Sequence, residues 1–466
     1  MRQFASIFTA SMLILLAISL PTNHVEGQFA TNTPVGQGDS NDTNEDTSDS
    51  DEADELQPPS SGFSFATNTQ IGPTNTATST PTSTATASNT PTATFTPSST
   101  PSPTATPNGP FSYPQGVNPL TGLQYPDEAA MLRRNLIVKI SNFPPLVRPQ
   151  HGINEADIVY EYEAEGGVTR FAAIYRSNNP ERVGSIRSAR LLDIELATMY
   201  NALLAYSGTS EPIQQLLLGE DFFNFQLISP LVGHGENQNN DCSETPFCRD
   251  DDLFASGTPR EHTLFGNTNQ MWAVGDRQGT NTGYVAFGFA FSEEPDANGA
   301  PANDISIDWW GQTDARWQYN ETDGIYQRFT DGQPHFDAAD GEQLWADNLV
   351  IVEVPHVNRP DLFPEGATYT SLGVELWGQG RVYVIRDGEV FQGFWRRNEN
   401  RALGQALQLV YGDNTPMMLQ PGRTWVTVVR GLGNANINED LVDVYATSTI
   451  TALTPSPTPF DPNPDS

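Results

Sequence analysis

The sequence predicts an α+β protein, in which a mixed α/β N-terminal lobe is followed by a mostly antiparallel, β-rich C-terminal lobe, with disordered Thr/Pro-rich tails. Strand-like and helix-like apolar patterns are mixed between residues 135 and 218. Alternating strand patterns separated by Asp-Gly pairs dominate from about residue 288. A body of this length exceeds one compact core of ordinary size, so we place two lobes at 111–287 and 288–433.

The N-terminus has the pattern of a secretory signal peptide over residues 1–27. Arg2 precedes an uncharged apolar run at 4–20, and the small residues Val25 and Gly27 occupy the positions that signal peptidase reads. A retained N-terminal anchor is the alternative, because the run approaches the roughly 17–25 residues that span a bilayer. We expect no lipid anchor, since no cysteine lies in or just after the run. Both alternatives predict an extracytoplasmic location, secreted or associated with the cell surface.

Residues 28–110 and 434–466 are expected to be disordered. The first segment has no lysine or arginine, and combines an acidic patch with a Thr/Ser/Pro-rich stretch; the second repeats the Thr/Pro-rich composition. Such segments bury too little apolar surface to offset the loss of chain entropy on folding. They predict a stalk, open to O-glycosylation, that holds the folded body away from a cell surface.

The charge of the chain restricts its partners. The formal net charge is −34, and Lys139 is the single lysine. A surface this acidic repels phosphodiester backbones and anionic lipid headgroups. We therefore expect no nucleic-acid partner, and membrane contact only through an uncleaved N-terminal segment.

The first lobe should contain a β-hairpin preceded by a buried strand. The apolar run at 135–142 predicts the buried strand. Segments 158–165 and 168–177 have strand patterns, and Gly166-Gly167 between them suits a tight turn.

Two helices should follow the hairpin. Apolar residues three and four apart predict a helix within 191–206, with Ser188 as a candidate N-cap. A second helix is expected at 211–218, with Ser210 as its cap and Pro212 in its first turn.

The second lobe should be a mostly antiparallel sheet or barrel. Its tight hairpins are predicted by Asp-Gly pairs that begin at Asp323, Asp331, Asp340 and Asp387. Tryptophans are frequent here, at positions Trp309, Trp310, Trp317, Trp377, Trp395 and Trp425. They could form a carbohydrate-binding platform, but aromatic residues at strand spacing are more often core residues or cross-strand pairs.

Cys242 and Cys248 are the only cysteines, six residues apart. In an oxidising compartment they can close a small loop, with a stabilisation of about 2 kcal/mol in the chain-entropy model. A metal site would need more ligands than two thiols without a neighbouring histidine. We expect a disulfide that fixes a surface loop.

Seven motifs in order resemble the YerB-like family of exported bacterial proteins, many of which are named as lipoproteins. The motifs are NPLTGL, RPQHGINEADIVYE, EGGVTRF, ERVGSIRSAR, REHTLF, DGQPHFDAADGEQL and LQPGRTWV. The resemblance covers nearly all of the folded body and implies a two-part α+β domain of unknown function in the cell envelope. The missing anchor cysteine and the Thr/Pro-rich stalk depart from the family pattern.

Three glutamates are the candidates for acid-base chemistry. Glu161, Glu163 and Glu165 alternate along a predicted strand, so their side chains should share one face at intervals of roughly 7 Å. Two carboxylates at that distance could act on a glycosidic bond, and His262 is the candidate general base. The alternative is a row of solvated carboxylates, or partners of nearby arginines, with a hydrogen-bonded structural histidine.

An arginine-rich stretch is the candidate binding site. Arg187, Ser188 and Arg190 stand at the expected helix start, where free N–H groups and guanidiniums favour an anion. Arg148 and Arg170 could join them. Gly166 and Gly167 could bring backbone N–H groups close to a ligand. The alternative is that these arginines pair with internal carboxylates and order the lobe.

Two functions from different classes follow. The first is a non-catalytic binding or scaffolding protein, whose arginine-rich cleft accepts the anionic group of a cell-wall component or envelope protein. The second is an envelope hydrolase or lyase that uses Glu161 or Glu165 with His262. A surface spacer, whose folded part serves only display, also stays open. No phosphate-binding glycine loop, zinc signature or calcium loop occurs, so we expect no cofactor and no metal.

Overall fold

The computed structural model describes residues 108–219, 226–309, 313–363 and 366–438. The predicted signal peptide, nearly all of the predicted stalk and most of the predicted tail lie outside these ranges, as does Trp310. Within these ranges, no helix combines the length and apolar composition needed to cross a bilayer.

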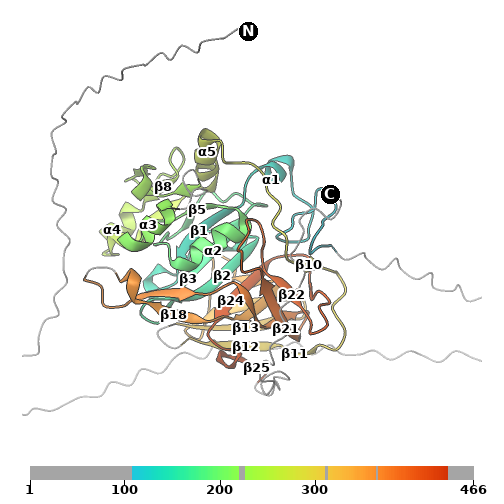
Figure 1. The fold of residues 1–466 in the computed structure, drawn as a ribbon. Helices are drawn as coiled ribbons and strands as arrows, with labels where there is room; N and C mark the ends of the chain where they lie inside the picture. Colours follow the sequence, from blue (N-terminus) through green and yellow to red (C-terminus); the bar gives the residue numbers. More distant parts are fainter. Residues whose placement is uncertain (1–107, 220–225, 310–312, 364–365, 439–466) are drawn as a thin grey trace, which may run out of the picture. The chain divides into compact units, whose positions relative to one another are not determined.

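An 11-stranded sheet organises the fold (Figure 1). Its strands, in spatial order, are β11 (Ala300–Pro301), β21 (Glu389–Arg397), β20 (Gly378–Arg386), β17 (Asn348–Glu353), β24 (Thr424–Val429), β2 (Ile158–Ala164), β3 (Val168–Tyr175), β1 (Leu136–Ser141), β5 (Leu203–Ala205) and β6 (Leu227–Ile228), with β22 (Gln408–Val410) paired to β21. The β2–β3 hairpin and the buried strand β1 confirm the predictions for this region.

Two groups of parallel strands in this sheet run in the same direction. Strands β17, β24 and β2 are parallel neighbours, and so are β1, β5 and β6. Strand β3 is antiparallel to both β2 and β1, which gives the two groups the same direction. Their carboxyl ends therefore meet at one side of the sheet, which we call the carboxyl edge.

The two predicted parts of the sequence both contribute strands to this sheet. Strand β24 comes from the end of the folded chain, yet it lies between β17 and β2. Each hydrophobic cluster also combines residues from both parts, for example Ile158 with Val426 and Val159 with Trp425. The fold class remains as predicted, with a mixed α/β N-terminal region and a mostly antiparallel C-terminal region.

Side chains alternate between the two faces of the large sheet, and different elements cover each face. The helices are α1 (Glu128–Leu132), α2 (Leu191–Tyr200), α3 (Glu211–Gly219), α4 (Asp251–Ala255) and α5 (Thr268–Gln278). Tyr160 and Tyr162 face the cluster that includes buried residues of α2 and α3. Val159 faces the opposite cluster, which includes buried residues of α5 and of a second sheet. Figure 1 shows the helices gathered around the blue-to-green part of the chain.

The second sheet has six strands and antiparallel pairing throughout. Its strands are β15 (Gln333–Pro334), β14 (Ile325–Thr330), β13 (Asp314–Asn320), β12 (Asp304–Asp308) and β25 (Ala435–Ile437), with β16 (Trp345–Ala346) paired to β14. Asp331-Gly332 and Asp387-Gly388 adopt left-handed conformations at hairpin turns, as predicted. Because β25 pairs with β12, the ordered chain extends beyond the predicted start of the tail at 434.

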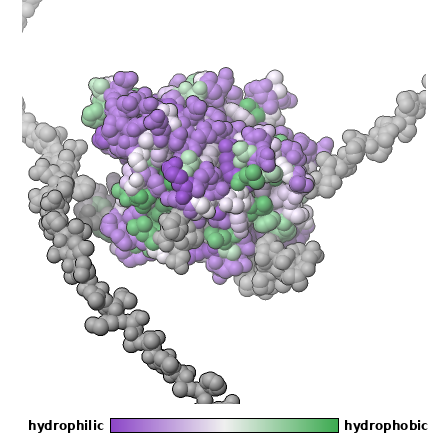
Figure 2. All heavy atoms as spheres, turned by 90° about the horizontal axis from the view of Figure 1, so that it is seen from above, coloured by the Kyte–Doolittle hydropathy of each residue, from purple (hydrophilic) through white to green (hydrophobic). Residues whose placement is uncertain are grey.

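Shorter strands complete the fold. They form the pair β10 (Ala290–Phe291) and β23 (Met418–Leu419), the hairpin β18 (His356–Arg359) and β19 (Ser371–Val374), and a sheet of β4 (Val183–Gly184), β9 (Leu264–Gly266), β8 (Phe247–Arg249) and β7 (Glu236–Asn237). From above, the surface is mainly hydrophilic, and its apolar residues form separate patches (Figure 2).

Helix α2 is shorter than the segment in which it was expected. It ends at Tyr200, because Asn201 takes a left-handed conformation (φ 41°), and residues 203–205 then form β5. Its N-cap is Arg190, not Ser188. Helix α3 agrees with the prediction, although the hydroxyl of Ser210 has no hydrogen-bond partner among the described residues.

The tryptophans favour the core alternative over a carbohydrate platform. Trp317, Trp395 and Trp425 are fully buried, and Trp309 is 7% exposed. Trp377 is half-buried, with the guanidinium of Arg401 5.2 Å from its ring centroid.

Candidate anion-binding site

Three arginines meet at the carboxyl edge of the large sheet. Arg170, on β3, pairs with Ser141 at the carboxyl end of β1. Arg187 lies between the ends of β1 and β5, where its N–H donates to Lys139 O (2.9 Å) and its carbonyl accepts from Ser207 N (3.1 Å). Arg190 caps α2. We call Arg170, Arg187 and Arg190 the arginine cluster.

Only one member of the arginine cluster has a carboxylate partner among the described residues. Arg190 forms an ion pair with Glu165, and its N–H donates to Asp193 Oδ2 (2.6 Å). Arg187 donates to the carbonyl of Glu261 (2.7 Å). Arg170 makes two long hydrogen bonds of 3.4 Å, to the carbonyls of Phe143 and Thr169. Two guanidiniums are therefore held at this edge without an ion pair.

The cluster and the neighbouring His262 have buried polar atoms that lack a partner among the described residues. These atoms are Arg170 Nε, Arg187 Nε and His262 Nδ1. Arg170 is only 7% exposed, and its burial, together with repulsion from Arg190 and Arg187, lowers its pKa to about 9. Burying a charge without a partner costs several kcal/mol. A bound anion would supply the missing partner of Arg170.

His262 lies beside Arg187 and Arg170. Its burial, followed by the charge of Arg187, lowers its pKa to about 4. The imidazole is therefore neutral at pH 7. A neutral imidazole can donate a hydrogen bond to an anion without adding charge, but one with this pKa is a weak general base.

A buried polar triad lies next to the cluster, and it was not among the predicted site residues. Lys139 Nζ contacts Tyr162 Oη and lies 3.3 Å from Asp193 Oδ1, while the Tyr162 hydroxyl donates to the same carboxylate. Lys139 and Asp193 are fully buried. Burial, opposed by Asp193, lowers the pKa of Lys139 to about 7. The available signal was the single lysine of an acidic chain, placed inside an apolar strand.

Glu161 belongs to a separate, structural network. Its side chain is fully buried, and Arg328 Nη2 donates to both of its oxygens (2.9 and 3.1 Å). Trp425 Nε1 (3.2 Å), Thr169 Oγ1 (3.0 Å) and Asn142 Nδ2 (3.2 Å) also donate to this carboxylate. Both oxygens of the carboxylate are thus occupied by donors of the protein, and the side chain is not free to contact a substrate.

Arg148 belongs to this network and not to the arginine cluster. It forms an ion pair with Asp331 and donates to the carbonyl of Asn142 (2.9 Å). Burial is the main cause that lowers the pKa values of Arg328 and His335, and the positive charge of Arg148 lowers them further. It therefore ties β1 to the second sheet.

The other two glutamates have different arginine partners. Glu163 pairs with Arg430 (2.7 Å), and Glu165, beyond the end of β2, pairs with Arg190. The three glutamates thus do not form a free row of carboxylates. Gly166 and Gly167 have positive φ values of 87° and 70°, as their turn requires, and the ring of Tyr369 lies against Gly166.

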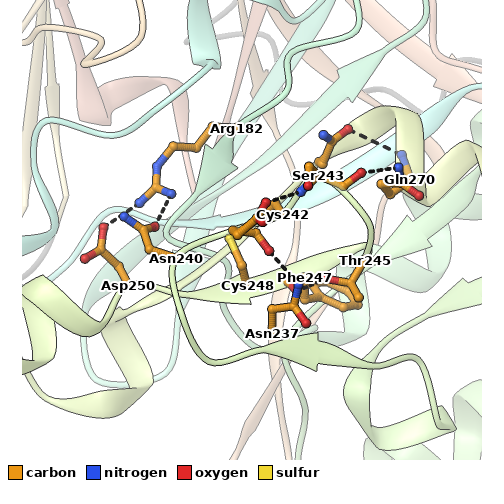
Figure 3. The surroundings of a disulfide bond; sticks show 12 residues. Arg182, Asn237, Asn240, Cys242, Ser243, Thr245, Phe247, Cys248, Asp250 and Gln270 are labelled. Atoms are coloured by element: carbon orange, nitrogen blue, oxygen red, sulfur yellow. Dashed lines mark hydrogen bonds and ion pairs between the residues drawn. A yellow bond between two sulfur atoms is a disulfide. The ribbon is translucent and has the colours of Figure 1, made fainter.

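The predicted disulfide is present, and the cysteines face each other across the loop that precedes β8 (Figure 3). The Cα atoms of Cys242 and Cys248 are 4.9 Å apart. In the described parts of the chain, no three His, Cys, Asp or Glu side chains gather as metal ligands.

Comparison with known proteins places the chain in a family. Residues 120–281 match "Protein of unknown function (DUF3048) N-terminal domain", and residues 305–426 match the corresponding C-terminal domain. The chain is 26% identical over 329 residues to "Putative lipoprotein YerB" of Bacillus subtilis (strain 168), covering 69% of this chain and 88% of that protein. The crystal structure of YerB protein from Bacillus subtilis has a similar fold, with a TM-score of 0.54 and 24% identity over 68% of this chain and 98% of that one. The chain therefore belongs to the YerB-like family and carries both parts of its domain of unknown function.

Proposed function

We propose that the chain is a non-catalytic binding or scaffolding protein of the cell envelope, and that its arginine cluster accepts a carboxylate or phosphate group. The observation that carries this proposal is the pair Arg170 and Arg187, buried or half-buried without a carboxylate partner in the described structure. In a chain with a net charge of −34, cations left unpaired among so many carboxylates suggest a ligand.

The position of the cluster supports the same proposal. Ligands of open sheets with parallel strands bind outside the carboxyl ends of the strands. Arg187 lies where β1 and β5 separate, because the residues beyond Val138 and Ala205 pair with the segment around Arg187 instead of with each other. Guanidiniums suit carboxylates and phosphates, since their forked N–H groups can bind two oxygens at once.

The alternative, an envelope hydrolase or lyase, has less support. Glu161 is enclosed by five hydrogen bonds from four residues, and Glu165 is paired with Arg190. His262 has a pKa of about 4, far below the range in which a general base is efficient at neutral pH. Binding requires none of these groups to change protonation state.

An extracytoplasmic location agrees with the name of the relative from Bacillus subtilis and with the N-terminal sequence of this chain. The relative from Bacillus subtilis is named as a putative lipoprotein, and this chain begins with the pattern of a signal peptide. The partner we propose is the anionic group of a cell-wall component or of another envelope protein.

A thermal-shift screen tests the proposal. Purified protein would be melted with phosphate, phosphodiesters and carboxylates, alongside Arg187→Ala and the control Arg430→Ala, which removes a paired arginine of the same edge. An anion at 100 times its Kd stabilises the folded state by about 2.7 kcal/mol. We expect an anion to raise the melting temperature of the parent and of Arg430→Ala, but not of Arg187→Ala. Equal shifts in all three proteins would refute the assignment of the site.

A further inference from the structure

A polar pocket lies away from the arginine cluster, beside the disulfide. Its volume is about 400 Å³, within the range of small-molecule sites. It is lined by the disulfide loop, the segment before β4 and the start of α5. The lining residues are Glu181, Arg182, Asn240, Asp241, Cys242, Ser243, Asn267, Asn269 and Gln270. We call it the disulfide pocket.

Asn267 carries an unused hydrogen-bond donor in this pocket. It is the N-cap of α5, and its Oδ1 accepts from the N–H groups of Asn269 (2.9 Å) and Gln270 (3.3 Å). The residue is only 6% exposed, and its amide NH₂ group makes no hydrogen bond within the described structure. Because Nδ2 keeps some solvent access in the described structure, this donor is available to a ligand in the pocket.

The charge of the pocket is negative. Arg182 is engaged by Asp250 (2.6 Å) and by Asn240 Oδ1 (2.5 Å). Glu181 forms no ion pair among the described residues, and Asp241 uses one oxygen to accept from Ser243 N (2.8 Å). Two carboxylates thus remain available as acceptors, and they would repel an anion.

We infer that the disulfide pocket binds a sugar unit that is neutral or carries an amine. Side-chain amides offer both donors and acceptors, and carboxylates accept from hydroxyl groups, so the lining matches a ligand with many hydroxyls. The absence of aliphatic and aromatic side chains from the lining disfavours an apolar ligand. This site is independent of the arginine cluster, whose positive charge selects an anionic ligand.

The disulfide holds the wall of the pocket in place (Figure 3). Around Cys242, the Asp241 carbonyl accepts from Asn237 Nδ2 (2.8 Å), and the Ser243 carbonyl accepts from Gln270 Nε2 (2.5 Å). These contacts join the loop to β7 and to α5. A covalently fixed wall lowers the entropy lost when a ligand binds.

Calorimetric titration of the full chain with N-acetylglucosamine, glucosamine and glucuronate tests the inference. Asn267→Asp keeps a good helix cap but replaces the free donor by an acceptor. Glu181→Ala removes a free carboxylate. Glu244→Ala, in the same loop but outside the pocket lining, is the control.

We expect the neutral or amine-bearing sugar to bind the parent and Glu244→Ala equally, and Asn267→Asp and Glu181→Ala at least tenfold more weakly. Glucuronate should bind more weakly than the other two sugars. The double variant Cys242→Ser/Cys248→Ser should lose sugar binding. Its melting temperature should still rise with the anion that stabilises the parent through the arginine cluster. The inference is overturned if no sugar binds the parent, if Asn267→Asp binds like the parent, or if glucuronate binds best.

Discussion

Replacing Arg170 by methionine should stabilise the protein and remove anion binding at the same time. Arg170 is 7% exposed, its Nε has no partner in the described structure, and its two side-chain hydrogen bonds are both 3.4 Å long. Methionine has a comparable volume and an apolar, flexible side chain that can fill much of the same space. The variant therefore removes a buried unpaired charge and gives up only weak hydrogen bonds.

The size of the effect follows from the pKa of Arg170. Its fall from the ordinary value of arginine to about 9 corresponds to roughly 5 kcal/mol against the charged form, which is an upper limit. Replacing buried ions by apolar side chains of similar volume stabilises proteins by about 1–4 kcal/mol. We expect Arg170→Met to raise the free energy of unfolding by about 1–3 kcal/mol.

Urea unfolding with and without phosphate measures this effect. Without phosphate, Arg170→Met should have the higher midpoint. With phosphate at saturation the difference should shrink or reverse, because only the parent gains stability from the ligand. An ion-paired arginine behaves in the opposite way, since its loss leaves a carboxylate uncompensated. A variant destabilised by more than about 1 kcal/mol in the absence of anion would mean that Arg170 is structural, and would refute the reasoning.

Three further predictions concern stability. Lys139 has a pKa of about 7 in the folded state and near 10.5 in the unfolded state, so the unfolded chain binds more protons between these pH values. The free energy of unfolding should therefore rise from pH 7 to pH 9, by up to about 1.4 kcal/mol per pH unit. Urea unfolding at pH 7, 8 and 9 should show a smaller slope for Lys139→Met, and an unchanged slope would contradict the assignment. Glu161→Ala should lower the free energy of unfolding by about 3–5 kcal/mol, because it leaves Arg328 buried without its partner. In chemical denaturation, the double variant Glu161→Met/Arg328→Met should regain much of this stability. Reducing Cys242–Cys248 should lower the free energy of unfolding by about 2 kcal/mol, and calorimetry that shows no change would mean that the loop gains nothing from the disulfide.

Local features of the fold could be predicted from the sequence. Gly166-Gly167 between two alternating segments predicts the β2–β3 hairpin, and the Asp-Gly pair at Asp387 predicts the turn between β20 and β21, because both depend on neighbouring residues. The end of α2 was missed, since the apolar pattern continues past Tyr200 into β5, and only the left-handed Asn201 separates them.

The long-range pairing of strands could not be predicted in the same way. Strand β24 pairs with β2, over 250 residues earlier in the chain, so that Glu161 lies opposite Thr427. Such a contact depends on tertiary packing and leaves no local pattern. For the same reason, the sequence could not show which arginines belong to the candidate site and which belong to the structural network around Glu161. Arg148 and Arg170 both belong to the arginine-rich stretch, but they lie in different networks on opposite faces of the sheet.

Isothermal titration of inorganic phosphate into the parent, Arg170→Met and Arg430→Met tests the central claim most directly. The account predicts that phosphate binds the parent and Arg430→Met with similar affinity, and that binding weakens as salt increases. It also predicts no measurable binding to Arg170→Met, although that variant is the more stable protein. If phosphate binds none of the three proteins, or binds Arg170→Met as well as the parent, the arginine cluster is not a phosphate site and the account is contradicted.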